Sequence, residues 1–284
     1  MDKTKKLSTK KRKKILSTIL LYAVLIGLSV IVLIPFIWMV SASLKQNNEV
    51  FTIPIKWIPN KLNFKNYVDI WTTVPLLSFF KNTVFLSVTI TAIQLLTSSF
   101  AAYGFSKVTF KGRDTLFLMY VATIAVPWQV FMIPQFLIVK KMGLVDNLWS
   151  LVLMQAFNSF GVFLMRQYYM SIPEELSEAA RIDGLSEWGI FRRIILPLTK
   201  PALASLTIIT FVNTWNDYMG PFIYLNSTAN KTIQLGLKMF VSQYDAQFAL
   251  IMAASVVSII PIAIIFLLMQ KNFVEGISTS GMKG

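Results

Sequence analysis

The sequence predicts an all-α polytopic membrane protein with six transmembrane helices. Of its 284 residues, 55% are hydrophobic and only 14% are charged, and the mean hydropathy is +0.61. Soluble domains are about one quarter charged. Long stretches without Asp, Glu, Lys or Arg recur along the chain, and about 20 mostly apolar residues are enough for a helix to cross a bilayer. Composition and hydropathy therefore argue against a soluble domain.

The charge and the missing residue types restrict the functions to consider. A net charge of +14 would suggest nucleic acid in a soluble protein, but here the basic residues lie beside apolar stretches, which favours a topology signal. The chain has no Cys and no His. A disulfide and a thiolate metal site are thereby excluded, and the commonest general base and metal ligand is absent. An enzyme embedded in the membrane is therefore disfavoured.

Six spans can be placed in order along the chain. The first follows a basic "KKRKK" run, and its apolar stretch of about 25 residues exceeds the 7–15 of a signal peptide, so we expect a retained helix. The last-but-one span is the shortest and continues as "DYMGPFIYL", interrupted by Asp217. The uncharged stretches are 15–44, 82–106, 115–139, 147–165, 201–216 and 246–270.

The distribution of Lys and Arg predicts the orientation. With the N-terminus inside, 18 of the 27 basic residues fall in cytoplasmic segments, as the positive-inside rule requires. Six spans then return the C-terminus to the cytoplasm. The predicted organisation is a basic cytoplasmic N-terminus (1–14), a first transmembrane helix (15–40), an extracytoplasmic segment (41–81), a transmembrane core (82–270) containing a cytoplasmic loop (171–200), and a cytoplasmic tail (271–284).

The loop 171–200 is unusually charged for this chain and reads like a soluble helix. Ser171 followed by Glu174 matches a capping box, with Pro173 in the first turn. We expect the helix to end at Gly184, which can take a left-handed conformation. A second short element should follow Ser186 and lead to the fifth span. The adjacent alanines of "EAA" predict a small, flat surface for a partner, while a capped helix lying on the membrane without a partner is the plain alternative.

The spacing within this loop resembles the EAA motif of membrane subunits of binding-protein-dependent ATP-binding-cassette (ABC) importers. That resemblance implies the type I ABC importer permease fold, with a coupling helix that docks in a cleft of an ATPase subunit. The motif residues and their neighbour are Glu178, Ala179, Ala180, Asp183, Gly184, Ile194, Leu196 and Pro197.

Further stretches resemble the carbohydrate, maltose-permease-like branch of that family. These are "FVNTWNDYMGPFIYL" (211–225), the wider loop "IPEELSEAARIDGLSEWGIFRRIILPLTKPAL", and the ending "GMKG". The resemblance implies that the tail reaches between the ATPase subunits, through Gly281, Met282, Lys283 and Gly284. A terminus without a partner is the alternative for the tail.

The resemblance also implies the function and the partners. The chain has no GxxxxGK[ST] phosphate loop, so we expect no ATPase activity and no cofactor of its own, with ATP and Mg²⁺ bound by a partner. The implied protein is a multi-pass permease subunit in the plasma or inner membrane of a bacterium or archaeon. It would import a mono- or oligosaccharide by ATP-driven alternating access. The implied partners are a second homologous permease, two ATPase subunits, an extracytoplasmic sugar-binding protein and membrane lipid, and no nucleic acid.

The fifth span carries the residue types that a sugar pathway needs. Sugars require amide or carboxylate hydrogen-bonding groups and aromatic surfaces. An acid at a helix centre costs about 2.5–3.5 kcal/mol on insertion scales, so Asp217 should face a cavity, a partner or the outer interface. The resemblance implies that the other permease of a maltose-type pair holds most sugar contacts. The candidate pathway residues are Asn213, Trp215, Asn216, Asp217 and Tyr218.

Two other function classes remain open. A permease of the same superfamily for a non-sugar solute would share the loop. An ion-coupled secondary transporter would need ionisable groups within its spans, and Asp217 is the one candidate.

Overall fold

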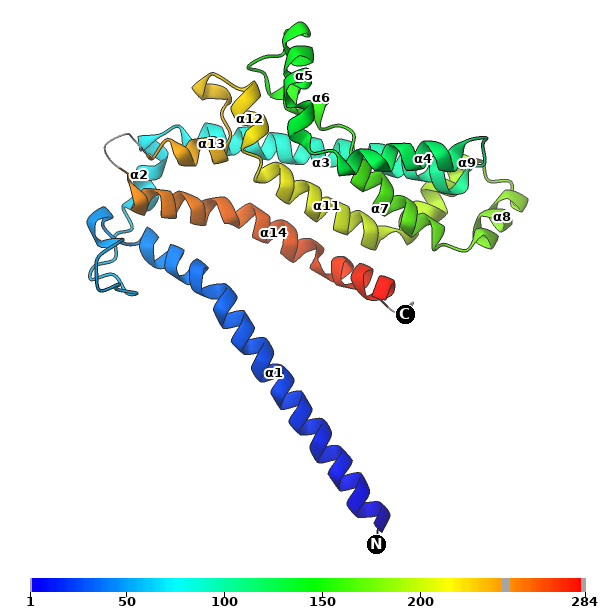
Figure 1. The fold of residues 1–284 in the computed structure, drawn as a ribbon, viewed down its shortest axis with the longest axis horizontal. Coiled ribbons are helices and arrows are strands. Elements are labelled where there is room, and N and C mark those ends of the chain that lie inside the picture. The colour runs from blue at the N-terminus through cyan, green and yellow to red at the C-terminus, as the bar shows by residue number, and fades with distance from the viewer. Residues whose placement is uncertain (1, 242–245, 282–284) are drawn as a thin grey trace. The chain divides into compact units, whose positions relative to one another are not determined.

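The computed structural model describes residues 2–241 and 246–281, and apart from an isolated bridge between Val241 and Ala246 their regular structure is helical (Figure 1). The helices are α1 (Asp2–Ser43), α2 (Asn66–Thr73), α3 (Leu76–Lys107), α4 (Arg113–Ala122), α5 (Trp128–Lys141), α6 (Leu148–Met154), α7 (Ser159–Met170), α8 (Glu174–Ile182), α9 (Glu187–Ile190), α10 (Leu196–Leu198), α11 (Lys200–Trp215), α12 (Met219–Tyr224), α13 (Ile233–Lys238) and α14 (Phe248–Gly281). Short 3₁₀ turns lie at η1 (Asn47–Glu49), η2 (Thr123–Ala125) and η4 (Thr228–Asn230), and η3 (Phe191–Ile195) is a π-helical turn.

The chain divides into two compact units. The first contains residues up to 70 together with 240–257, and the second contains 71–239 and the remainder of α14. In the first unit, the side chain of Asn47 donates to Ala246 O at 3.0 Å and accepts from the backbone N–H of Ala249 at 3.3 Å. These bonds tie the segment after α1 to the start of α14.

Within the described part of the chain, three helices are long and apolar enough to cross a membrane on their own. They are Lys14–Ser43 within α1, Leu76–Lys107 and Phe248–Asn272 within α14. The uncharged stretch of the sequence starts at residue 82, but α3 begins earlier, at Leu76. The helix includes Lys81 as a single charge among apolar residues. The helix α14 continues beyond residue 270 to Gly281.

The other three predicted spans are broken helices. The pairs Arg113–Ala125 with Trp128–Lys141, Leu148–Met154 with Ser159–Met170, and Glu187–Leu198 with Lys200–Trp215 are bent by 99°, 44° and 76°. The structure therefore has three candidate spans, or up to six if each bent pair is one span, by length and composition.

Local sequence explains where these helices break. Pro127 forces the preceding Val126 into an extended conformation (φ −87°, ψ 117°), which ends η2 before α5 begins. Asn158 starts α7 because its side-chain oxygen accepts from the backbone N–H groups of Phe160 and Gly161, at 3.0 and 3.4 Å. Neither Pro127 nor Asn158 is charged, so an uncharged stretch of sequence does not reveal these two breaks.

The second unit is built on α3, which packs against α7 and α11 along its length. A Cβ placed on Gly161 of α7 would lie 2.4 Å from Ser98 Oγ of α3 and 3.3 Å from Leu206 of α11. A larger residue at position 161 would therefore require the side chains of Ser98 and Leu206 to shift, so glycine favours this close approach of α7.

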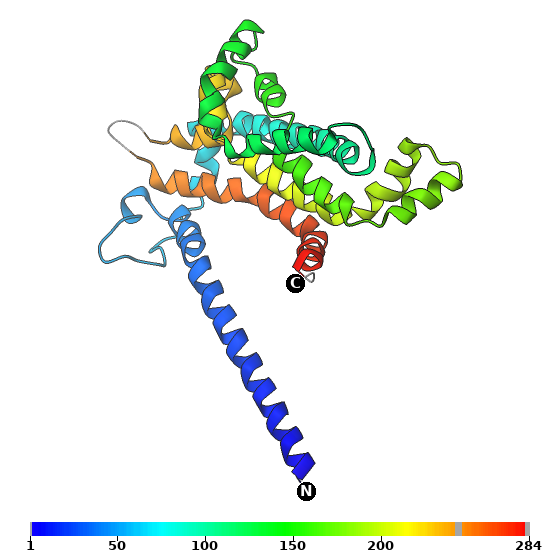
Figure 2. The same ribbon diagram turned by 45° about the vertical axis from the view of Figure 1, so that its right-hand side comes forward.

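Two clusters of buried residues lie within this unit. One joins α3, α7 and α11 to α8, α9 and η3, with Met165, Tyr169 and Ile190 among its fully buried members. The other joins α3, α5, α6 and α12 and includes Ile90 and Leu151. In both views α8 and α9 project beyond one end of α3, whereas α12 and α13 lie toward its other end (Figures 1 and 2).

Candidate functional site: a projecting loop and a polar cavity

The loop helix α8 begins without the capping box that its sequence suggests. The Ser171 hydroxyl donates to Tyr168 O at 2.8 Å and so belongs to the end of α7. The helix α8 starts after Pro173, with no side-chain cap. The expected capping box is therefore wrong, because Glu174 is drawn instead to cations on two sides.

The end of α8 is a Schellman motif at Gly184, as the sequence predicts. Gly184 has φ +80°, its N–H donates to Arg181 O at 3.0 Å, and the N–H of Leu185 donates to Ala180 O at 2.9 Å. Leu185 packs on the same buried cluster as Ala180. The next element begins with Ser186, whose hydroxyl accepts from the N–H of Gly189 at 3.3 Å.

The helix α8 has one face against the protein and one face open. Ser177 and Ala180 are buried, and Ala180 is 4% exposed. The two alanines of the motif therefore do not form one exposed flat surface, because Ala180 is buried and Ala179 is exposed. The open face carries Glu178 and Ala179, and ends in Ile182, which is 87% exposed.

Hydrogen-bonded ion pairs fasten the loop to the end of α3. The buried ammonium of Lys107 donates to Glu174 Oε2 and to Ile172 O, each at 2.9 Å. Arg181 bridges Glu174 and Glu187, at 3.4 and 2.8 Å. The Tyr103 hydroxyl donates to Glu187 Oε2 at 2.6 Å. Sequence inspection misses Tyr103 and Lys107, although their spacing of four puts them on one helix face.

The remaining motif residues lead the chain from the loop into α11. Ile194 and Leu196 are half-buried against the cluster that contains Ile190 and Phe191. Pro197 is exposed and lies two residues before Thr199, at which the 76° bend occurs. Asp183 caps the end of α8 and is exposed.

A cavity of about 310 Å³, with both apolar and polar side chains in its lining, lies in the same unit, where two helix breaks meet. It is enclosed by α3, α5, the break between α6 and α7, and the break between α11 and α12. The lining residues are Gln94, Trp128, Gln135, Met154, Gln155, Phe157, Asn158, Asp217, Met219, Gly220 and Tyr224.

Amide side chains form hydrogen bonds with backbone and side-chain polar groups at the helix breaks. Gln94 Nε2 donates to Gln155 O at 2.6 Å, and Gln94 Oε1 accepts from Asn158 Nδ2 at 2.9 Å. Gln155 Nε2 donates to Asp217 Oδ2 at 2.9 Å, and the N–H of Gly220 donates to Asp217 Oδ1 at 3.1 Å. Such side-chain partners allow non-helical backbone at membrane depth.

Asp217 lines this cavity, whereas Trp215 lies in the helix packing. Trp215 is 0% exposed, stacks on Phe211 and donates to Ser258 Oγ at 3.3 Å. Trp215 therefore does not line this cavity, and its contact with a substrate stays a prediction.

The other three predicted pathway residues do not line the cavity. Asn213 and Asn216 are exposed, and Asn216 accepts from Gln234 Nε2 at 3.3 Å. Tyr218 stacks on Phe222, and Lys238 donates to its hydroxyl at 3.3 Å. The aromatic and amide groups that do line the cavity include Trp128, Gln135 and Phe157, which sequence inspection misses.

Of the four residues of the predicted tail contact, the structure describes only the first. Gly281 is the last residue of α14, and Met282, Lys283 and Gly284 lie outside the described residues.

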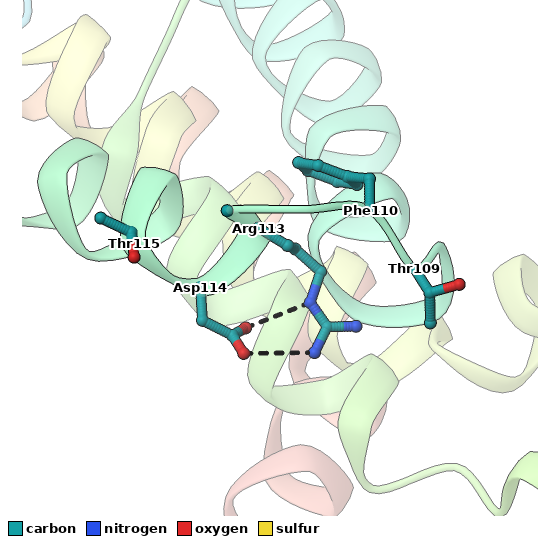
Figure 3. A pocket seen from close by; sticks show the side chains of 6 residues that line it. Thr109, Phe110, Arg113, Asp114 and Thr115 are labelled. Atoms are coloured by element: carbon teal, nitrogen blue, oxygen red, sulfur yellow. Dashed lines mark hydrogen bonds and ion pairs between the residues drawn. The ribbon is translucent and has the colours of Figure 1, made fainter.

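A further depression lies on the turn between α3 and α4 and is formed by six neighbouring residues (Figure 3). Arg113 and Asp114 pair across it, with Nε and Oδ1 3.1 Å apart. Arg166 of α7 reaches Asp114 Oδ1 at 3.0 Å and Phe105 O at 2.9 Å. The charged groups of Arg113, Asp114 and Arg166 form ion pairs with one another, and these pairs link α3, α4 and α7 at this turn.

Comparison with known proteins agrees with the loop motif. Residues 94–279 match the family described as "binding-protein-dependent transport system inner membrane component". The arabinooligosaccharide transport system permease of Halalkalibacterium halodurans is 34% identical over 96% of this chain and 100% of its own length. The lactose transport system permease of Rhizobium radiobacter is 31% identical over 92% of this chain and 95% of its own.

A solved structure has the same fold. The chain superposes with a TM-score of 0.79 and 28% identity on a bacterial ABC transporter involved in the import of the acidic polysaccharide alginate, covering 89% of this chain and 95% of that one. The fold, the loop motif and the family match agree: the chain belongs to the binding-protein-dependent transport system inner membrane components, the permeases of ABC importers.

Proposed function

We propose that this chain imports a mono- or oligosaccharide as one permease of an ABC importer, by ATP-driven alternating access. In this proposal it crosses a bacterial or archaeal plasma or inner membrane six times, with both termini in the cytoplasm. The support is the excess of Lys and Arg in the segments assigned to the cytoplasm, together with three long apolar helices and three bent pairs.

The observation that carries the proposal is the construction of α8. Its open face presents Glu178, Ala179 and Ile182. Its first residue, Glu174, is bound by Lys107 of α3, and Arg181 near its end bonds Glu187, which also accepts from Tyr103 of α3. A helix held this firmly moves as one body with the spans behind it. We assign it as the coupling helix, with its open face docked in an ATPase cleft.

The remaining loop residues then have structural roles in coupling. The helix α8 ends at Asp183 and Gly184, and Ala180 packs it on the buried cluster. The segment from Ile194 through Leu196 and Pro197 joins the loop to α11. In the same scheme the tail residues Gly281, Met282, Lys283 and Gly284 contact the ATPase subunits.

Energy must come from partners in this scheme, since the chain has no phosphate loop. Two ATPase subunits bind ATP and Mg²⁺, a second homologous permease completes the pathway, and an extracytoplasmic protein delivers the sugar. To move the inward–outward equilibrium from 1:99 to 99:1, ATP must favour one state by about 5.5 kcal/mol. A rigid α8 transmits that preference.

The sugar assignment rests on the relatives and on the cavity. Relatives are named for arabinooligosaccharide, lactose and alginate transport. Asp217 lies among amides and aromatic side chains rather than in a ring of charge, and neutral hydroxylated ligands need that mixture.

Uptake by the purified, reconstituted complex tests the proposal. Proteoliposomes with both permeases and both ATPases should accumulate sugar when ATP and the loaded binding protein are present, without an ion gradient. Uptake that follows an ion gradient and ignores ATP would instead indicate a secondary transporter. If no sugar raises ATP hydrolysis but another solute does, the chain is a permease for that solute.

A further inference from the structure

We infer that this chain has a carbohydrate subsite of its own, which holds one neutral sugar ring in the cavity beside Asp217. The inference rests on the proposed function, because it concerns the same cargo. It differs from an arrangement in which the partner permease holds most of the sugar contacts.

The charge of the lining selects a neutral ligand. Asp217 is the one ionisable acid among the lining residues, and the lining contains no Lys or Arg. An acidic sugar would bring a second negative charge into a partly closed site with no cation to offset it. A neutral ring brings hydroxyl groups, which donate to the carboxylate at no such cost.

The amide of Gln135 is oriented to donate to a ligand. Its Oε1 accepts from Trp128 Nε1 at 2.9 Å and from the Tyr224 hydroxyl at 3.4 Å. These two donors fix which end of the amide faces the protein. Among the described residues none accepts from Gln135 Nε2, so its two hydrogens remain for a hydroxyl oxygen.

Asp217 supplies acceptors on the other side. Its oxygens accept from the backbone N–H groups of Gly220 and Met219 and from the side-chain amide of Gln155. An ionised carboxylate accepts about four hydrogen bonds, so the Asp217 carboxylate keeps an acceptor position for one hydroxyl group of a ligand. The cavity thus offers a donor from α5 and acceptors from the α11–α12 break, as a ring of hydroxyl groups requires.

An aromatic surface completes the subsite. Phe157 lies in the break between α6 and α7, lines the cavity and is 74% exposed. The C–H face of a sugar ring can pack on such a side chain. At about 310 Å³ the cavity is at the lower end of the ligand-site range of about 300–1,000 Å³, which suits one ring of a longer sugar.

Sugar transported per ATP hydrolysed tests the subsite in the reconstituted complex. The substitutions Gln135→Met and Phe157→Ala remove the donor and the packing surface, and the ratio corrects for any loss of assembled protein. We expect each to lower the ratio about ten-fold, the effect of losing about 1.4 kcal/mol. Phe163→Ala, on the adjoining α7 and outside the cavity lining, is the control and should leave the ratio unchanged.

Photo-cross-linking tests contact directly. The complex carrying p-benzoylphenylalanine at position 157 is illuminated with radiolabelled lactose, maltose and arabinobiose. We expect label on this chain, competed by the unlabelled neutral sugars and not by digalacturonate. The same cross-linker at position 163 should take no label.

The outcomes separate the two proposals. If the wild-type complex moves sugar with ATP but both variants keep the wild-type ratio, the subsite is wrong and the function stands. Equal competition by digalacturonate overturns the neutral-ring selection. If no sugar stimulates the wild-type complex, the proposed function fails and the subsite with it.

Discussion

The Tyr103 hydroxyl donates a 2.6 Å hydrogen bond to the carboxylate of Glu187, which joins the last turns of α3 to the first residue of α9. The same carboxylate accepts from Arg181 Nε at 2.8 Å. Two elements of the loop and one membrane helix therefore meet on a single side chain.

Removing one oxygen from this junction should weaken coupling. Tyr103→Phe deletes the hydrogen bond to a charged group, which contributes about 1.5–3 kcal/mol, and leaves Arg181 with Glu187. We expect sugar transported per ATP to fall several-fold while the complex still assembles. The matched control is Tyr120→Phe, since no side-chain hydrogen bond of Tyr120 is found in the described part of the chain. Equal effects of the two changes would contradict the assignment.

Gly184 should be sensitive to backbone conformation rather than to size. A Cβ there would meet nothing within 4 Å, yet φ is +80°, which costs an ordinary residue about 1–2 kcal/mol and a β-branched one more. We expect Gly184→Val to insert and assemble but to lose substrate-stimulated ATP hydrolysis and uptake.

Gly184→Asn supplies the control for that experiment, because Asn tolerates the left-handed region. It should keep most of the activity. Normal stimulated ATPase and uptake in the Val variant would show that the end of α8 does not transmit motion.

Two glycines in neighbouring helices should respond differently to substitution by Ala. Gly161→Ala places a methyl group 2.4 Å from Ser98 Oγ, and such overpacking costs about 1–3 kcal/mol. Gly104→Ala adds a methyl group in open space on α3 and should be neutral or slightly stabilising. Thermal unfolding of the purified complex measures both, and equal midpoints would refute the close approach of α3 and α7.

Asp146 should make stability depend on acid pH. The backbone N–H of Ser227, with further bonds from the Ser227 hydroxyl and Asn226 N–H, holds the pKa of this carboxyl below its ordinary value. The carboxylate therefore stabilises the folded state above its unfolded pKa of about 3.9, and this contribution is lost as pH falls through the lower folded pKa.

Asp146→Asn isolates that charge, because Asn keeps the acceptor oxygen and tolerates the φ of +62° at this position. At pH 6 the free energy of unfolding of the wild type should exceed that of the variant by about 1 kcal/mol. The difference is no larger because solvent screens this half-buried group. The difference in unfolding midpoint should shrink toward zero as the pH falls through the lowered folded pKa of Asp146. A difference that is constant with pH would rule out the carboxylate as its source.

The sequence predicts the positions of the apolar segments because hydropathy is an average over many residues. It also predicts the end of α8, since only a few residue types adopt the left-handed conformation that Gly184 has. It fails at the start of α8, where the capping-box pattern is present but Lys107, far away in sequence, takes the Glu174 side chain.

The cavity is harder to predict for a related reason. Which residues line it depends on where three spans break, and an amide such as Gln135 looks the same in sequence whether it faces lipid, helix or cavity. Trp128 and Gln135 are seven residues apart on α5 and so share a face. That spacing, seen beside Pro127, is the signal that could have found them.

The helix α11 connects the loop to the cavity. Its 16 residues extend about 24 Å, with the projecting loop joined at Lys200 and Asp217 just past the other end. A tilt of about 10° over that length moves the far end by about 4 Å. The Gln155–Asp217 hydrogen bond is 2.9 Å long and would not survive such a step. A rotation of α11 relative to the α6–α7 break would therefore break this bond and change the lining of the cavity.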